Sequence, residues 1–561
     1  MYKPARPRPK KTDIVRSRNG CKSCRERRTK CDERKPSCGT CIRLGRVCET
    51  INRGFQFRVV TSVSEKPSTK TGPAGPDLGP LQLQQSFSGY GHSHALPNID
   101  LIHSLQHTDR DVFYTTYWED NCLPALHPIF RSASESLGLP ALKDAILALS
   151  SCNISRIHAE RKSPTSVVTS GTFCPNLSHQ TRSQLYYSSA IRKFTSLTTQ
   201  DYQNNVTLVL TILVLFGYIE ASMGNFHGFY HHVQGLSGLL VELRDTTGDP
   251  FFRALLSAWL QSQYLVWWAR AYFSSLYVQR HLPSIPFPSM LEETSNSIHD
   301  RRVVALSILC ESHRLNAKAA LRYWQLNEEP NPTFYLHNLQ PDPEFDAQLK
   351  NQSHRLDKWL LQLPASEQPI ATTTPETSPI FFQSHDAALN FAYHVVARIM
   401  QCTSFLHNLP FRDPQHLGTE CSEMKPWVRL LLQIAQGTNQ QTLLTRNTYS
   451  IGFSGLLLAA SLRCQDQTLR TEIEKWLQAL QEKQPTEEGA FPVYQALAVV
   501  KAINQQREIG HDVFAVSQPV DDGGGEPKFT CYNSQMISTL LVHGKRRDSG
   551  ELFTECIDLD M

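Results

Sequence analysis

The sequence has no apolar run long enough to cross a lipid bilayer. Its most apolar stretch, VTLVLTILVLFGY at 206–218, is 13 residues long, whereas a helix needs about 20 residues to span the hydrocarbon core. The opening residues, MYKPARPRPKKTDIVRSRNG, lack the apolar segment of a secretory signal. We therefore expect no membrane partner, and an intracellular location in which thiols stay reduced.

The sequence also lacks the short motifs that mark common catalytic and nucleotide-binding sites. No G-x-x-x-x-G-K-[ST], G-x-G-x-x-G, H-E-x-x-H or G-x-S-x-G occurs. The pairs His231–His232 and His92–His94 could ligate a metal. However, adjacent rings on a helix, as at His231–His232, do not converge on one ion, and a flexible His-Ser-His segment in a linker is usually only solvated. We therefore predict that the protein is not an enzyme. An enzyme acting on a small metabolite is the alternative, which a pocket with clustered carboxylates or histidines would favour.

Acidic residues are scarce in the first 60 positions. This segment has 18 Lys and Arg against 5 Asp and Glu, a balance of +13, so the remaining residues carry −9 of the total +4. A basic N-terminal segment followed by an acidic remainder indicates that residues 1–60 bind a polyanion, and nucleic acid is the leading candidate.

Cysteine is sparse except in one short segment, CKSCRERRTKCDERKPSCGTCIRLGRVC at 21–48. The chain has 15 cysteines, and six of them fall here with the spacing C-x2-C-x6-C-x6-C-x2-C-x6-C. A tetrahedral zinc site needs four sulfurs, so two separate sites would need eight. The six cysteines form two similar halves, Cys21, Cys24 and Cys31, then Cys38, Cys41 and Cys48. Six sulfurs suffice for two zinc ions only if one cysteine from each half binds both ions. The twofold pattern favours the first cysteine of each half, Cys21 and Cys38.

This segment resembles the fungal Zn(II) binuclear cluster family of transcription factors, in the six spacings, the basic run CRERRTKC and Pro36. The resemblance implies two short helices around two zinc ions. It implies that one zinc is held by Cys21, Cys24, Cys31 and Cys38, and the other by Cys21, Cys38, Cys41 and Cys48.

The resemblance also implies DNA contacts. It implies that Arg27 and Arg28 read base edges from a helix in the major groove, commonly at a CGG-like triplet. Arginine forks pair with guanine O6 and N7, which agrees with that role. We expect other basic residues to contact phosphates: Lys22, Arg25, Lys30, Arg43 and Arg46.

Other interpretations of the cysteine segment are less favoured. A disulfide knot conflicts with a reducing compartment, and iron–sulfur sites use different spacings. A zinc unit that acts as a scaffold, or binds RNA or protein without reading DNA bases, is the alternative function. No leucine heptads follow the cluster, so a homodimer and its half-site spacing are left open.

Composition divides the chain into five parts. We predict a basic disordered arm at 1–20, the zinc cluster at 21–50, a flexible linker rich in Pro, Gly and Ser at 51–98, an all-α regulatory domain at 99–515, and a partly disordered tail at 516–561. The fold class is thus a small zinc domain joined by a disordered linker to a large all-α domain.

The body and the tails carry further expectations. Residues 111–156 resemble the start of the fungal-specific transcription factor regulatory domain, which implies control of activity rather than chemistry. Trp259, Trp267 and Trp268 are expected in the core, with a ligand pocket as the alternative. Lys10 and Lys11 are candidates for nuclear import, and KRR at 545–547 is a weaker one. The acidic and apolar end, SGELFTECIDLDM, suits either an activation segment that folds on a coactivator or a disordered terminus.

Together these features predict a nuclear, sequence-specific DNA-binding regulator of RNA polymerase II promoters. Its expected partners are double-stranded DNA and transcription coactivators or corepressors, and its cofactors are two zinc ions.

Overall fold

A computed structural model describes two parts of the chain. In the first part it describes residues 21, 23–24, 29, 31–32, 34, 37–46 and 48. In the second it describes 107–559 apart from 136–138, 158–159, 162–172, 243–248, 294–295, 328–342, 371–377, 410–422, 484–486, 490 and 519–538. The predicted arm, the linker, Lys10, Lys11, His92 and His94 lie outside the described residues. So do Lys22, Arg25, Arg27, Arg28 and Lys30.

The chain forms two compact units, residues 1–71 and 72–561. In the first unit, Ser23 and Cys24 are helical and α2 spans Gly39–Arg43. The second unit is mostly helical, so the predicted fold class, a small cysteine-rich unit followed by a large helical domain, is confirmed.

The first half of the helical body comprises short and long helices in chain order: α4 (His107–Tyr117), a π-helical turn (Trp118–Cys122), a 3-10 turn (Leu123–Ala125), α5 (Ile129–Glu135), α6 (Pro140–Ile157), α7 (Leu177–Thr195), α8 (Thr199–Asn204), α9 (Val206–Met223), α10 (Phe226–Glu242), α11 (Pro250–Tyr272) and α12 (Leu276–Arg280). A two-residue ladder, β1 (Glu160–Arg161) with β2 (Phe173–Cys174), joins α6 to α7.

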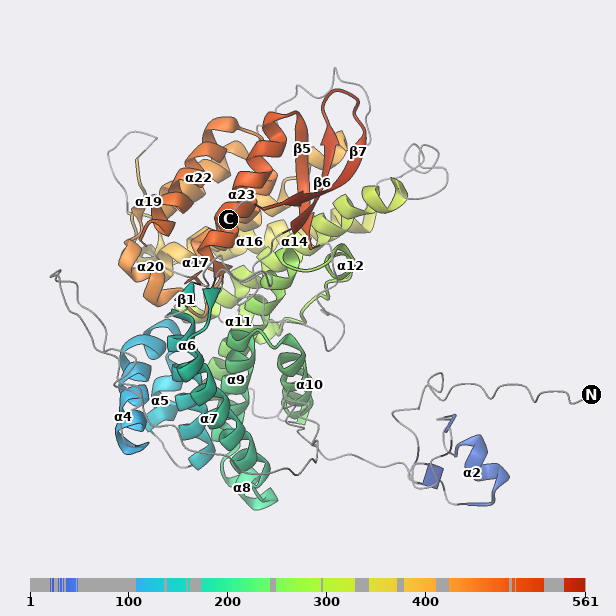
Figure 1. The fold of residues 1–561 in the computed structure, drawn as a ribbon, viewed down its shortest axis with the longest axis vertical. Coiled ribbons are helices and arrows are strands. Elements are labelled where there is room, and N and C mark those ends of the chain that lie inside the picture. Colours follow the sequence, from blue (N-terminus) through green and yellow to red (C-terminus); the bar gives the residue numbers. More distant parts are fainter. Residues whose placement is uncertain are drawn as a thin grey trace, which may run out of the picture. The chain divides into compact units, whose positions relative to one another are not determined.

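The second half continues with α13 (Ser289–Glu293), α14 (Ile298–Asn327), α16 (Pro343–Leu361), a 3-10 turn (Ala365–Glu367), α17 (His385–Gln401), α18 (Ser404–Asn408), α19 (Lys425–Gly437), α20 (Gln440–Arg446), α21 (Phe453–Arg463), α22 (Gln467–Gln481) and α23 (Val493–Glu508). Its strands are β3 (Glu487–Glu488), β4 (Phe491–Pro492), β5 (His511–Ser517), β6 (Thr539–Arg546) and β7 (Leu552–Asp558). Helices α11 and α14 pack on each other and connect the two halves (Figure 1).

The apolar run at 206–218 lies in α9, at the centre of the first half. By length and composition α9 could cross a membrane, with a mean hydropathy of 2.0, but 78% of it is buried inside the body. It packs against α6, α10 and α11. Gly224 ends the helix with φ 70°, a left-handed conformation that glycine adopts without steric cost. The run is therefore part of a buried core helix, as the sequence analysis predicts.

Part of the segment 516–561, for which we predict a partly disordered tail, is folded as strands. Its residues Thr539–Arg546 and Leu552–Asp558 form β6 and β7, which pair antiparallel with each other, and β6 also pairs with β5. The Trp324 indole on α14 donates to the Phe553 carbonyl at 3.0 Å, and Phe553 is buried. The central part of SGELFTECIDLDM, Leu552–Asp558, is therefore an edge strand of this sheet.

The basic trio at 545–547 also lies in this sheet. Lys545 is only 2% exposed. Arg546 donates to Glu555 on β7 at 2.8 Å, and Arg547 donates to Asp512 on β5 at 2.7 Å. The two arginines therefore help to hold the strands together, and Lys545 is buried in the same sheet.

Truncation after Ser549, which removes β7, is expected to destabilise the helical body. The loss includes burial of Phe553, about 1.5–3 kcal/mol, and leaves β6 with an unpaired edge. Thermal unfolding of the full-length and truncated proteins measures this effect. Asp558→Ala, which removes one exposed acidic side chain from β7, is the control and should leave the unfolding temperature unchanged. Equal unfolding temperatures for the truncated and full-length proteins would contradict a structural role for this strand.

Candidate metal centre

Two short structural repeats position the six cysteines. Cys21 precedes the helical residues Ser23 and Cys24, and Cys38 is the N-cap of α2, which carries Cys41. In each repeat the first two cysteines are three positions apart across a helix start, so their side chains can face the same point. The predicted twofold pattern is therefore visible in the backbone.

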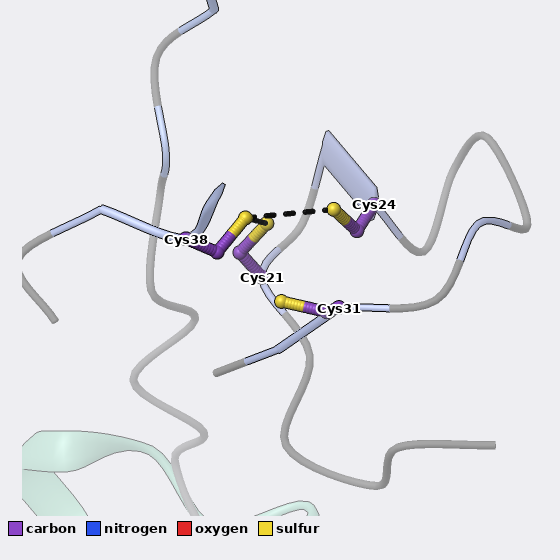
Figure 2. A group of neighbouring side chains, drawn as sticks. All are labelled: Cys21, Cys24, Cys31 and Cys38. Carbon is purple, nitrogen blue, oxygen red and sulfur yellow. Dashed lines mark hydrogen bonds between the residues drawn. The ribbon is translucent and has the colours of Figure 1, made fainter. Parts of the chain in front are cut away.

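The sulfur atoms form two groups of four, each with all its sulfurs within 4.8 Å of one another. The first group is Cys21, Cys24, Cys31 and Cys38, and the second is Cys21, Cys38, Cys41 and Cys48. Figure 2 shows the first group, with the Cys38 sulfur close to those of Cys21 and Cys24. Both groups contain Cys21 and Cys38, the two cysteines that the spacing favours as shared ligands.

The distances between sulfurs fit tetrahedral zinc. They are 3.8 Å for Cys21–Cys38, 3.7 Å for Cys24–Cys38 and 3.5 Å for Cys21–Cys41. Zinc–sulfur bonds of about 2.3 Å place tetrahedral ligands roughly 3.8 Å apart. A disulfide needs about 2.05 Å, and all six thiols are free. The donor set therefore suits two zinc ions and not a disulfide knot.

The two cysteines common to both groups, Cys21 and Cys38, accept backbone hydrogen bonds. The N–H of Cys41 donates to the Cys38 sulfur at 3.4 Å and lowers the pKa of Cys38. The N–H of Cys24 lowers the pKa of Cys21 in the same way. Thiolates are the metal-binding form of cysteine, so the fold favours that form at the two positions where one sulfur faces both groups.

Asp32 and Gly39, which the sequence interpretation did not single out, hold the second repeat in place. The Gly39 N–H donates to both carboxylate oxygens of Asp32, at 3.0 and 3.2 Å. A Cβ at Gly39 would lie 2.8 Å from one of these oxygens. The sequence did hold one indication of this contact. Asp32 directly follows Cys31, and Gly39 directly follows Cys38, the next cysteine of the segment.

Two of the predicted phosphate contacts lie in the described part of this unit. Arg43 is in the last turn of α2 and Arg46 follows it, and both side chains are exposed. Exposed guanidinium groups beside the cluster are available to a polyanion.

Of the other candidates in the body, His231 is exposed, whereas His232 and the three tryptophans are core residues. Trp259, Trp267 and Trp268 are at most 4% exposed, as predicted. His232 lies 2.9 Å from the Tyr187 hydroxyl, which also donates to Glu220 at 2.6 Å. The cysteine groups are the sets of possible metal ligands found among the described residues.

A pocket lies beside α14 and α16. Its single carboxylate, Glu292, accepts two hydrogen bonds of 3.0 Å from Arg355. Its Arg301 is paired with the buried Glu367. Glu292 and Arg301 are thus each paired with an opposite charge. The pocket lining contains one carboxylate and no histidine, whereas an enzyme interpretation requires a cluster of such groups.

Comparisons with known proteins match both units. Residues 19–56 match the fungal Zn(2)-Cys(6) binuclear cluster domain, which holds two zinc ions, and residues 100–497 match the fungal specific transcription factor domain. No solved structure matches the chain.

Three curated relatives illustrate the likeness. A lysine biosynthesis regulatory protein of Saccharomyces cerevisiae is 62% identical over 32 residues, 6% of this chain and 4% of that protein. A transcriptional regulatory protein of Schizosaccharomyces pombe is 38% identical over 86 residues, 15% of this chain and 16% of that protein. An aspercryptin biosynthesis cluster-specific transcription regulator of Emericella nidulans is 24% identical over 229 residues, 39% of this chain and 33% of that protein.

The chain thus spans at most a third of the length of these relatives. The second family match alone covers more than half of the chain, and the first coincides with the two cysteine groups. The protein therefore belongs to the fungal specific transcription factors that carry a Zn(2)-Cys(6) binuclear cluster.

Proposed function

We propose that this protein is a sequence-specific DNA-binding transcription regulator that acts in the nucleus at RNA polymerase II promoters. The observation that supports this most directly is the pair of four-sulfur groups that share Cys21 and Cys38. Two zinc ions held there stabilise a 28-residue unit too small to fold on an apolar core. The +13 balance of residues 1–60 supports DNA as the partner of that unit.

In this proposal the ligands are the six cysteines, as two sets of four with Cys21 and Cys38 in both. Arg27 and Arg28 read base edges of a CGG-like half-site, and Lys22, Arg25, Lys30, Arg43 and Arg46 contact phosphates. Residues 99–515 regulate activity and contact coactivators or corepressors, and Lys10 and Lys11 contribute to nuclear import. Residues 51–98 act as the linker.

In vitro site selection with the zinc-loaded full-length protein tests the function. We expect enrichment of a short GC-rich triplet. A spaced pair of triplets would identify a homodimer, and a single triplet a monomer. Binding to RNA and duplex DNA alike, with no base preference, would instead support the zinc-dependent scaffold.

Arg28→Ala is expected to relax base choice at one position of the site. Loss of a bidentate contact to guanine costs about 1–3 kcal/mol on the preferred sequence and little on a mismatched one. Arg43→Ala is the matched control. It should weaken binding equally on all sequences and reduce the slope of the logarithm of the binding constant against the logarithm of salt concentration by about one, the value for one phosphate contact. Titrations of both variants on matched and mismatched duplexes at several salt concentrations measure the difference. An equal loss on every sequence for Arg28→Ala would make Arg28 a phosphate contact.

A further inference from the structure

Three backbone N–H groups in the turn that begins α2 each donate to a different acceptor. The N–H of Cys38 donates to the Cys48 sulfur at 3.3 Å, and the N–H of Cys41 donates to the Cys38 sulfur at 3.4 Å. The N–H of Gly39 donates to both carboxylate oxygens of Asp32, at 3.0 and 3.2 Å. Two of these acceptors are sulfurs of the second four-sulfur group, and the third is a carboxylate that belongs to neither group. The hydrogen bonds of Asp32 therefore require no metal ligand.

Asp32 and Gly39 occupy equivalent positions, because each directly follows a cysteine of the first four-sulfur group, Cys31 and Cys38. Cys31 belongs to the first group alone, whereas Cys38 belongs to both. The hydrogen bonds between Asp32 and Gly39 fix the backbone after one of these ligands relative to the backbone after the other. The contact thus connects the end of the first repeat to the turn that begins the second.

Among the described residues, electrostatic attraction does not explain the position of Asp32. The Arg34 Nε atom lies 3.7 Å from Asp32 Oδ2, but the Arg34 side chain is 81% exposed, and such exposed ion pairs contribute little to stability. Six thiolates carry more negative charge than two zinc ions neutralise, so the metal-loaded unit repels a nearby carboxylate. The hydrogen bonds from the Gly39 N–H are therefore the contacts that favour an acceptor oxygen at this place.

The close approach of the two residues depends on the absence of a side chain at Gly39. A Cβ at this position would lie 2.8 Å from Asp32 Oδ2, which is closer than non-bonded carbon and oxygen atoms pack. The carboxylate would have to move away from the Gly39 N–H to admit an alanine. The contact can therefore be weakened from either end, by removal of the carboxylate or by addition of a methyl group.

We propose that Asp32 is a positioning residue for the zinc ion of the first four-sulfur group. It holds Cys31 and Cys38 at the separation that this ion requires, and it thereby slows the loss of the metal. Groups that orient metal ligands without touching the metal typically change metal affinity by about 10–100-fold when they are removed. The Asp32 side chain is 40% exposed, so we expect an effect at the lower end of that range. The inference rests on the proposed zinc ligands and does not depend on which DNA sequence the protein reads.

The test measures the rate at which zinc-loaded full-length protein transfers its zinc to excess pyridylazoresorcinol, a chelator whose zinc complex is coloured. Asp32→Ala is expected to increase this rate about tenfold. Asp32→Asn keeps one acceptor oxygen for the Gly39 N–H, so its rate should stay within about threefold of the wild-type rate. Arg34→Ala is the matched control. It removes an exposed cation beside Asp32 and should leave the rate unchanged.

Gly39→Ala tests the same contact from its other end and keeps the test valid if Asp32→Ala does not fold. It should also increase the rate of zinc transfer, because the added Cβ displaces the carboxylate. In combination with Asp32→Ala it should add nothing, since the contact is already lost. Two variants that only lowered stability in general would instead multiply each other's effects.

A wild-type rate for both Asp32→Ala and Gly39→Ala would overturn the positioning role of Asp32 and leave the zinc ligands as proposed. So would multiplied effects in the double variant, or equal rates for Asp32→Asn and Asp32→Ala. A wild-type protein that holds fewer than two zinc ions would contradict the ligand assignment itself, and this inference with it.

Discussion

Cys38→Ala is expected to remove both zinc ions from the protein, whereas Cys48→Ala removes mainly one. The Cys38 sulfur belongs to both four-sulfur groups, and the Cys48 sulfur belongs to one. Loss of the shared thiolate leaves each zinc with three protein ligands and takes away the link between the two repeats. Because metal binding and folding are coupled in such small units, we expect specific DNA affinity to fall by about 10³ or more.

Zinc content per chain, measured by elemental analysis after gel filtration, checks this expectation. The wild-type protein should carry two zinc ions, Cys48→Ala about one, and Cys38→Ala close to none. Cys556→Ala, which removes an exposed free thiol on β7, is the control and should keep two. Retention of both zinc ions in Cys38→Ala would contradict the shared role of this cysteine.

Arg507→Met is expected to destabilise the helical body by about 3–5 kcal/mol, the range for breaking a buried charged network. Arg507 is 2% exposed. Its two terminal nitrogens donate to Ser461, Leu462 and Cys464 at the end of α21 and to Val513 on β5, at 2.7–2.9 Å. Those carbonyls of α21 have no partner within the helix, so the substitution leaves four buried acceptors unsatisfied.

For a cooperative unit of roughly 400 residues this loss corresponds to a fall of about 4–6 °C in unfolding temperature. Differential scanning calorimetry of the two proteins measures it. Arg446→Met is the matched control, because this arginine makes one exposed hydrogen bond to the Pro124 carbonyl and should change the temperature by less than about 1 °C. Similar shifts for the two variants would show that Arg507 does not join α21 to β5.

The zinc unit was predictable because its information is local. Six sulfur donors within 28 residues and the fixed requirement of zinc for four ligands lead to a shared arrangement without knowledge of the fold. The two groups in the structure are those that the spacing and the family resemblance indicate. The interaction of Asp32 with the Gly39 N–H was missed, because an Asp beside a Glu in a charged segment looks like ordinary surface charge.

The helices were predictable from apolar periodicity, but their ends were not. The stretch at 251–277 reads as one helix, yet α11 ends at Tyr272 and Ser275 caps α12. The stretch at 449–483 also reads as one, yet Asp466 accepts from the Leu469 N–H and begins α22. Short polar residues within a helical pattern can face solvent or cap a new helix, and packing determines which.

The C-terminal sheet could not be recognised from its strands alone. β5 and β6 are separated by more than 20 residues, and β7 has an alternation that a disordered acidic segment also shows. Strand pairing is a non-local interaction, and β-propensity depends on the neighbours that a strand finds. Gly544 illustrates this dependence, because a Cβ there would lie 2.5 Å from the Phe553 ring and from the Asp512 carbonyl.

Metal chemistry and helical periodicity are thus set by residue types at short separations, and they could be inferred from the printed sequence. The role of Arg507 could not, because a sequence alone does not tell an exposed arginine from a buried one. Tertiary packing places Arg507 against four carbonyls. The free energy of a buried charge depends on the partners that distant segments bring to it.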